Sequence, residues 1–137
     1  KYSDKDLKSI SVMHYEYSGG AHPNHYYTCH SYYNGNEIFL TNVINTDNAS
    51  IKSLDKLIIS DLEKQEAAWI IDGDKTSYEK ELNSNEIPYL FATKGIEFYF
   101  SPYIAGPYAQ GSFVTPIPYS AVKPLLKPDA PIKYLIK

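Results

Sequence analysis

The most informative gaps in this 137-residue sequence are the absence of arginine and the presence of a single cysteine. All thirteen basic residues are lysines, and the formal net charge is −3. Proteins that read nucleic acids usually carry a basic face with arginine side chains on bases or phosphates, so we expect no nucleic-acid partner. Cys29 has no second cysteine to pair with, which excludes an internal disulfide and argues against a small disulfide-stapled secreted domain.

Long apolar segments are also missing. No run approaches the roughly 18 residues of a membrane-spanning helix, so we expect no membrane span in this chain. The sequence starts Lys1-Tyr2-Ser3, with neither an initiator methionine nor a hydrophobic signal segment. We therefore expect a mature or excised piece of a protein, with a length that suits one domain and one core.

Tyrosine, by contrast, is abundant, with fourteen residues against one tryptophan and five phenylalanines. A tyrosine buries a large ring and keeps a polar tip, which suits sheets and wet binding surfaces. Residues 8–17 and 25–33 are dense in β-formers and predict two strands. Asn34-Gly35 then favours a type I′ turn into a third strand over residues 37–40. The chain therefore opens with a predicted β-meander.

The hydrophobic period then changes to three or four residues, which predicts an amphipathic helix over residues 50–70, capped by Asp47, Asn48 or Ser50. The pattern of the remaining chain predicts these elements in order: a short helix 76–82, strands 89–93 and 96–100 joined by a Lys94-Gly95 turn, a strand 112–117, a short helix 119–126 and a last strand 132–136. The predicted fold class is α+β, with a mostly antiparallel sheet and helices on one face.

Signatures of enzymes are not found in the sequence. It contains no G-x-S-x-G nucleophile motif and no glycine-rich phosphate loop, and Cys29 lacks the flanking residues of the cysteine proteases. We therefore expect no catalytic residue and no cofactor. One alternative stays open, because His22, His25 and His30 have a spacing that could present imidazoles to zinc. The competing interpretation has His22 and His25 flanking a turn, with Cys29 as a small buried side chain.

The segment 101–111 differs in character from the rest of the chain. Its closely spaced glycines and prolines favour a loop of defined shape, and Tyr103 and Tyr108 lie within it. Rigid aromatic side chains on a shaped loop are typical of surfaces that bind carbohydrate or protein. The alternative is that these two rings are buried in the core beneath a long loop.

Two stretches resemble a bacterial family. Residues 17–23 (YSGGAHP) are similar to its aromatic-x-G-G-A-H signature. Residues 98–103 (FYFSPY), 106–111 (GPYAQG) and 117–120 (IPYS) are similar to its F-x-F-x-P-Y, P-Y-A-x-G and I-P-Y-S motifs, in the same order and spacing. The family is the extracytoplasmic domain of unknown function in the lysozyme-sensing anti-sigma-V factor, which also accompanies some peptidoglycan deacetylases and occurs in many envelope lipoproteins.

This resemblance, over about residues 8–126, implies a non-catalytic α+β domain outside the cytoplasm, in the periplasm or at the cell surface with a lipid anchor as one option. Family members usually have a further N-terminal segment, so residues 1–137 are expected to be one domain or the C-terminal part of a larger one. The expected function is binding or sensing, with a lysozyme-like hydrolase or a peptidoglycan glycan as partner. The expected ligand-binding residues are His22, Asn24, Tyr103, Tyr108 and Gln110. The alternatives are a zinc-dependent cell-wall hydrolase or deacetylase and a structural accessory domain.

Overall fold

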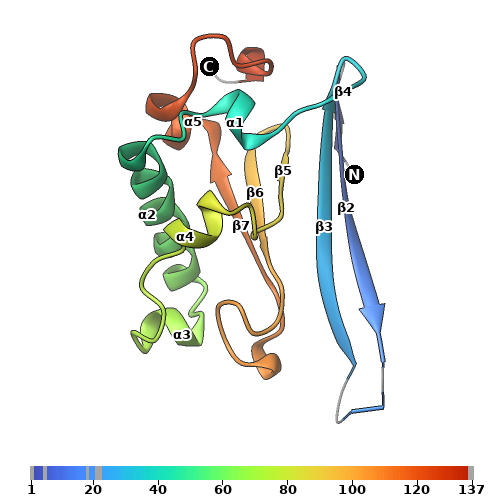
Figure 1. The fold of residues 1–137 in the computed structure, drawn as a ribbon, viewed down its shortest axis with the longest axis vertical. Helices are drawn as coiled ribbons and strands as arrows, with labels where there is room; N and C mark the ends of the chain where they lie inside the picture. The colour runs from blue at the N-terminus through green and yellow to red at the C-terminus, as the bar shows by residue number, and fades with distance from the viewer. Residues whose placement is uncertain (1, 5, 18, 21–22, 136–137) are drawn as a thin grey trace.

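The computed structural model of the chain describes all residues except 1, 5, 18, 21–22 and 136–137. Its elements form three layers, with the helices on one side, a three-stranded sheet in the middle and a four-stranded sheet on the other side (Figure 1). The α+β prediction is confirmed. The strands, however, divide between two antiparallel sheets instead of forming one.

The four-stranded sheet has the order β1-β2-β3-β4 and is dominated by one long hairpin. Its strands are β1 (Tyr2–Asp4), β2 (Leu7–Glu16), β3 (Asn24–Tyr33) and β4 (Asn36–Glu37). The register is continuous from Leu7↔Tyr33 to Glu16↔Asn24. Asn34 and Gly35 both have positive φ, at 51° and 83°, as the predicted I′ turn requires.

The predicted third strand over residues 37–40 is wrong beyond Glu37, because residues 38–39 belong to no strand and helix α1 (Leu40–Val43) begins at Leu40. Asn42 stabilises this turn of helix by accepting a hydrogen bond from the Phe39 N–H at its side-chain oxygen, 2.7 Å away. Leu40 and Val43 are then both buried on the core side of the short helix. Helical spacing therefore buries more apolar surface here than the alternation of a strand would.

The long helix α2 (Asn48–Lys64) begins at one of the predicted caps, since Asp47 accepts a hydrogen bond of 2.9 Å from the Ser50 N–H. It ends six residues before the predicted boundary at residue 70, where Glu66 takes a φ of +59°. A separate short helix, α3 (Ala68–Ile71), follows, and α4 (Glu79–Asn83) overlaps the helix predicted over residues 76–82. The break turns α3 toward the loop 101–111, where the Trp69 N–H donates to the Ala105 carbonyl at 3.1 Å.

The three-stranded sheet has the order β5-β6-β7. Its strands are β5 (Tyr89–Phe91), β6 (Gly95–Phe100) and β7 (Phe113–Pro118), each within two residues of its predicted bounds. The β5–β6 turn is closed one residue earlier than predicted, by the Ala92 N–H on the Gly95 carbonyl. Gly95 is the first residue of β6, and this position requires glycine because a Cβ there would be 2.2 Å from the Ile117 carbonyl oxygen.

The chain ends in short helical turns. The predicted helix after β7 is confirmed as α5 (Tyr119–Val122), followed by the 3-10 turn η2 (Lys123–Leu125). The predicted last strand over 132–136 is wrong, because a 3-10 turn, η3 (Lys133–Leu135), takes its place. Hydrogen bonds from Lys133 N–H to Ala130 and from Leu135 N–H to Ile132 close it, and neither the three-stranded nor the four-stranded sheet extends to this end of the described chain.

The main core lies between the helices and the three-stranded sheet, where α2 packs Ile51, Leu54, Ile58 and Leu62 on the sheet side. A smaller cluster lies on the other face of the same sheet, where Leu90, Ala92 and Tyr99 meet Tyr27 and Cys29 of the hairpin. In the part of the chain that the structure describes, no helix combines the length and apolarity needed to cross a membrane.

Candidate functional site

The loop 101–111 is tied to the helical layer by one glutamine. The Gln110 side-chain oxygen accepts a hydrogen bond of 2.8 Å from the Ala68 N–H, and its amide donates to the Glu66 carbonyl at 3.0 Å. Gly106 allows this approach, because a Cβ there would lie 2.2 Å from the same glutamine oxygen. Gln110, expected as a ligand-binding residue, therefore has its amide engaged with the backbone around α3.

Tyr78 holds the same loop from the inside. Its hydroxyl donates to the Ile104 carbonyl at 2.7 Å, and its ring meets Phe100 edge-on at 5.0 Å. The Tyr78 N–H donates in turn to the Asp55 carboxylate at 2.6 Å. Burial raises the pKa of the Tyr78 phenol and also that of the Asp55 carboxyl, so both groups resist ionisation beyond their ordinary ranges. The bonds of Gln110 and Tyr78 thus fix the loop 101–111 at two points in the absence of a ligand.

Two tyrosines remain at the surface of this fixed loop. The rings of Tyr103 and Tyr108 are 5.8 Å apart and inclined by 37°. Tyr103 is 48% exposed and has a φ of +73°, a left-handed conformation that costs a non-glycine residue free energy. Its neighbour Ile104 is 40% exposed. The loop therefore presents aromatic and apolar surface on a backbone that is held in an unfavourable conformation by its surroundings.

The hairpin end that joins β2 to β3 lies at the same end of the molecule as this loop, near the 3-10 turn η1 (Tyr108–Gln110) (Figure 1). Tyr27 of β3 connects the two, since its hydroxyl is 3.3 Å from that of Ser112. Asn24 is exposed there and accepts a hydrogen bond from the His25 N–H at its side-chain oxygen. His22, also expected at this site, lies outside the described residues.

The same end of the hairpin carries exposed tyrosines that were not among the residues predicted for the site. Tyr15, Tyr17 and Tyr26 are all exposed, and each lies within a few residues of the hairpin tip. We call these three residues, together with Tyr103 and Tyr108, the tyrosine end. The signal in the sequence was the run of tyrosines beside the Gly19-Gly20 turn, but strand alternation alone does not tell which of two faces is covered.

The described histidines of the zinc alternative lie on opposite faces of β3. His25 shares its face with Tyr27, whose ring it meets edge-on at 5.9 Å, whereas His30 is on the other face and bonds to Glu37 at 2.8 Å. Among the residues that the structure describes, no group of three histidine, cysteine or carboxylate side chains is close enough to hold a metal ion. Nothing in the described geometry therefore adds to the sequence argument for zinc.

Cys29 lies half-buried between the two sheets, as its interpretation as a packed side chain requires. Burial and the nearby Glu97 carboxylate raise the pKa of its thiol to about 12. The thiolate, which is the nucleophilic and metal-binding form, is therefore scarcely populated at neutral pH.

Comparison with known proteins identifies the family. Residues 41–120 match the family described as "Protein of unknown function (DUF3298)", and the chain belongs to it. No curated protein matches. A member of the same family from Bacteroides fragilis has a similar structure, with a TM-score of 0.68 and 22% identity over 98% of this chain. A DUF3298 family protein from Pseudomonas aeruginosa has a TM-score of 0.62 and 15% identity over 91% of this chain.

These two structures support the fold, and both proteins are longer than the chain. The matched region is 53% of the Bacteroides fragilis protein and 57% of the Pseudomonas aeruginosa protein, so the chain spans little more than half of either. The family match includes the loop 101–111 but begins after the hairpin, whereas the structural matches extend over nearly the whole chain.

Proposed function

We propose that this chain is a non-catalytic binding or sensing domain located outside the cytoplasm, and that the tyrosine end is its recognition surface. The observation that carries the proposal is the ring pair of exposed Tyr103 and half-buried Tyr108, on a loop fixed by Gln110 and Tyr78. A surface aromatic on a fixed backbone loses little conformational entropy when it binds, which is how hot-spot residues contribute affinity.

The composition of the tyrosine end favours a protein partner. Tyrosine is among the residues enriched in the cores of protein interfaces, whereas lysine and glutamate are depleted there. Tyr15 and Tyr17 add exposed rings near the hairpin tip, and Tyr26 adds one on the face of β3 opposite Tyr27. With the resemblance to the domain of the lysozyme-sensing anti-sigma-V factor, this favours a lysozyme-like hydrolase, with a peptidoglycan glycan as the second candidate ligand at the same surface.

Calorimetric titration of the folded chain with a C-type lysozyme, and in parallel with soluble peptidoglycan fragments, tests the proposal. Binding of lysozyme that weakens by at least about tenfold in Tyr108→Ala supports it, since losing a hot spot costs on the order of 2 kcal/mol. Tyr32→Ala is the matched control, because Tyr32 is exposed on β3 at the far end of the hairpin.

Three outcomes separate the possibilities. Lysozyme binding that is equal in the wild type and Tyr108→Ala would place recognition elsewhere on the chain. Glycan binding with the same loss in Tyr108→Ala would replace the hydrolase by a wall polymer as ligand. No heat with either ligand, from a sample shown to be folded, would overturn both partner assignments.

A further inference from the structure

Two hollows meet at one exposed aromatic ring, away from the tyrosine end. The first has a volume of about 270 Å³ and lies along the edge of β3, beside the segment that enters β5. The second has a volume of about 380 Å³ and lies among α1, α2 and α4. Phe39, Asn85 and Tyr89 line both hollows, so together these form one groove with Phe39 at its centre. Each hollow is near the lower end of the volumes of small-molecule sites, about 300 Å³.

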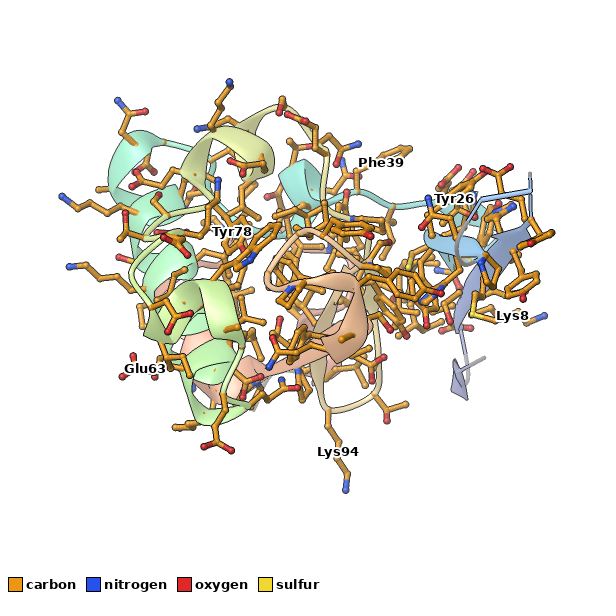
Figure 2. The ribbon with its side chains drawn as sticks, turned by 90° about the horizontal axis from the view of Figure 1, so that it is seen from below. Lys8, Tyr26, Phe39, Glu63, Tyr78 and Lys94 are labelled. Carbon is orange, nitrogen blue, oxygen red and sulfur yellow. The ribbon has the colours of Figure 1, made fainter. Side chains whose placement is uncertain are left out.

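Phe39 is presented to solvent by the way its neighbours pack. Ile38 and Leu40 are buried on either side of it, so the ring of Phe39 points outward and is 47% exposed. Figure 2 shows it projecting from the body of the molecule. The N–H and carbonyl of Phe39 are both bonded to Asn42, which fixes the backbone beneath the ring. An exposed phenylalanine on a fixed backbone contributes little to folding and is available to a ligand.

The rim of the groove carries four polar side chains that are available for hydrogen bonds to a ligand. Thr41, Thr46, Asn83 and Asn85 all line the second hollow and are exposed. Within the described part of the chain, none of these four side chains has a hydrogen-bond partner, whereas other surface groups, such as the Gln65 amide and the Ser84 hydroxyl, do. Asn85 has a φ of +59°, which holds its side chain at this rim on a turn after α4. Two amides and two hydroxyls therefore line the same hollow as the ring.

The charge of the groove limits the chemistry of its ligand. No lysine that the structure describes lines either hollow, and the chain has no arginine. The ionisable groups at the groove include Glu37 and His30, which are bonded to each other at 2.8 Å. A carboxylate or phosphate ligand would need a cation that the groove does not offer. A neutral ligand rich in hydroxyl groups matches the amides, hydroxyls and carboxylate at the rim.

We propose that this groove binds a neutral oligosaccharide chain, with one sugar ring stacked on Phe39 and its neighbours in the two hollows. The apolar C–H face of a pyranose packs on the aromatic ring, and its equatorial hydroxyls pair with Asn83, Asn85 and Thr46. An extended peptide is disfavoured, because a strand added to the open edge of β3 would occupy only the first hollow. Among the described residues that line the second hollow, none belongs to β3. The groove shares no residue with the tyrosine end. Mutations in one surface therefore test ligand binding there without altering the other surface.

The test is a titration of the labelled chain with cellotetraose and, separately, with chitotetraose, followed by backbone amide shifts in NMR spectra. These probes are neutral chains of linked sugars that differ in the acetamido group. We expect saturable shifts at residues 37–42 and 83–89 with at least one probe. Phe39→Ala should weaken this binding at least about tenfold. Asn85→Gly should also weaken it, since glycine keeps the positive φ and removes only the amide.

Ile71→Ala is the matched control, because Ile71 is an exposed apolar residue on α3 outside both hollows. The spectra of every variant show directly whether it is folded. Absence of shifts with both probes at about 10 mM, a concentration that would detect even millimolar affinity, overturns the proposal. Binding that is lost in Tyr108→Ala but kept in Phe39→Ala also overturns it, and assigns the glycan to the tyrosine end.

Discussion

The side-chain oxygens of Ser9 and Ser31 lie 2.8 Å apart between the two sheets, and together they bind both backbone groups of Phe91. Ser31 accepts from the Phe91 N–H at 3.0 Å, and Ser9 donates to the Phe91 carbonyl at 2.6 Å. Phe91 lies in the edge strand β5, whose free side would otherwise leave buried backbone groups unpaired. Two serines of the hairpin therefore replace the partner strand that β5 lacks.

Ser31→Ala should destabilise the chain by about 1–3 kcal/mol, because the mutation leaves the buried Phe91 N–H without an acceptor. Chemical denaturation measures the free energy of unfolding. Ser53→Ala on the exposed side of α2 is the control and should change it by no more than about 0.5 kcal/mol. An equally small effect of Ser31→Ala would mean that water satisfies the Phe91 backbone in place of serine.

Gln110→Ala should loosen the loop 101–111 and cost about 1 kcal/mol, because the Ala68 N–H and the Glu66 carbonyl both lose their partner. Amide hydrogen exchange at residues 68–70 measures the local effect, which should exceed the change at α2. Protection at these amides that is unchanged in the variant would show that Gln110 does not fix the loop, and would leave its amide available to a ligand.

Asp55 should make the protein less stable as the pH rises. Burial raises the pKa of this carboxyl above its ordinary value of 3.8, so the folded chain binds its proton more tightly than the unfolded chain does. The favourable contribution is complete below pH 3.8 and is lost as the pH rises through the higher pKa of the folded state.

Asp55→Asn removes this titration, while its amide oxygen can still accept from the Tyr78 N–H. Unfolding free energies measured from pH 3 to 7 should therefore change in favour of the variant as the pH rises, relative to the wild type. A difference that is constant across this range, or that moves in favour of the wild type, would contradict the raised pKa of Asp55.

Cys29 should react slowly with iodoacetamide in the folded chain and rapidly once the chain is unfolded. A thiol with a pKa raised to about 12 holds almost no thiolate at pH 8, whereas the unfolded thiol has its ordinary value of 9.0. Mass spectrometry of the alkylated protein with and without urea gives the two rates. Equal rates in a sample that is folded by circular dichroism would mean that Cys29 is accessible and its pKa unperturbed.

Local interactions were predictable from the sequence. The hairpin of β2 and β3 follows from two runs of β-formers. The tight turn from β3 to β4 follows from Asn34-Gly35, because a two-residue turn determines its own register. Asp47 was among three candidates for the cap of α2, since a side chain that reaches the third N–H ahead depends only on nearby residues. The loop 101–111 could likewise be identified from its glycines and prolines.

Contacts between distant segments were not predictable in the same way. The chain leaves α2 at Glu66, an ordinary helix former, because α3 gains a bond to Ala105 and packs on a loop almost forty residues away. The periodicity of residues 50–70 contains no sign of that bond. The stretch after Glu37 could be strand or helix by pattern, and the packing of Leu40 and Val43 in the main core decided between them.

The sequence by itself determined the α+β class, the order of most elements and the candidate loop, because turns, caps and hydrophobic periods act over a few residues. The tertiary structure alone decided that the strands divide into two sheets, that Ser9 and Ser31 join them, and that Phe39 lies between two hollows. Those features depend on which faces are buried against segments distant in the chain, and burial is a property of the whole packed molecule.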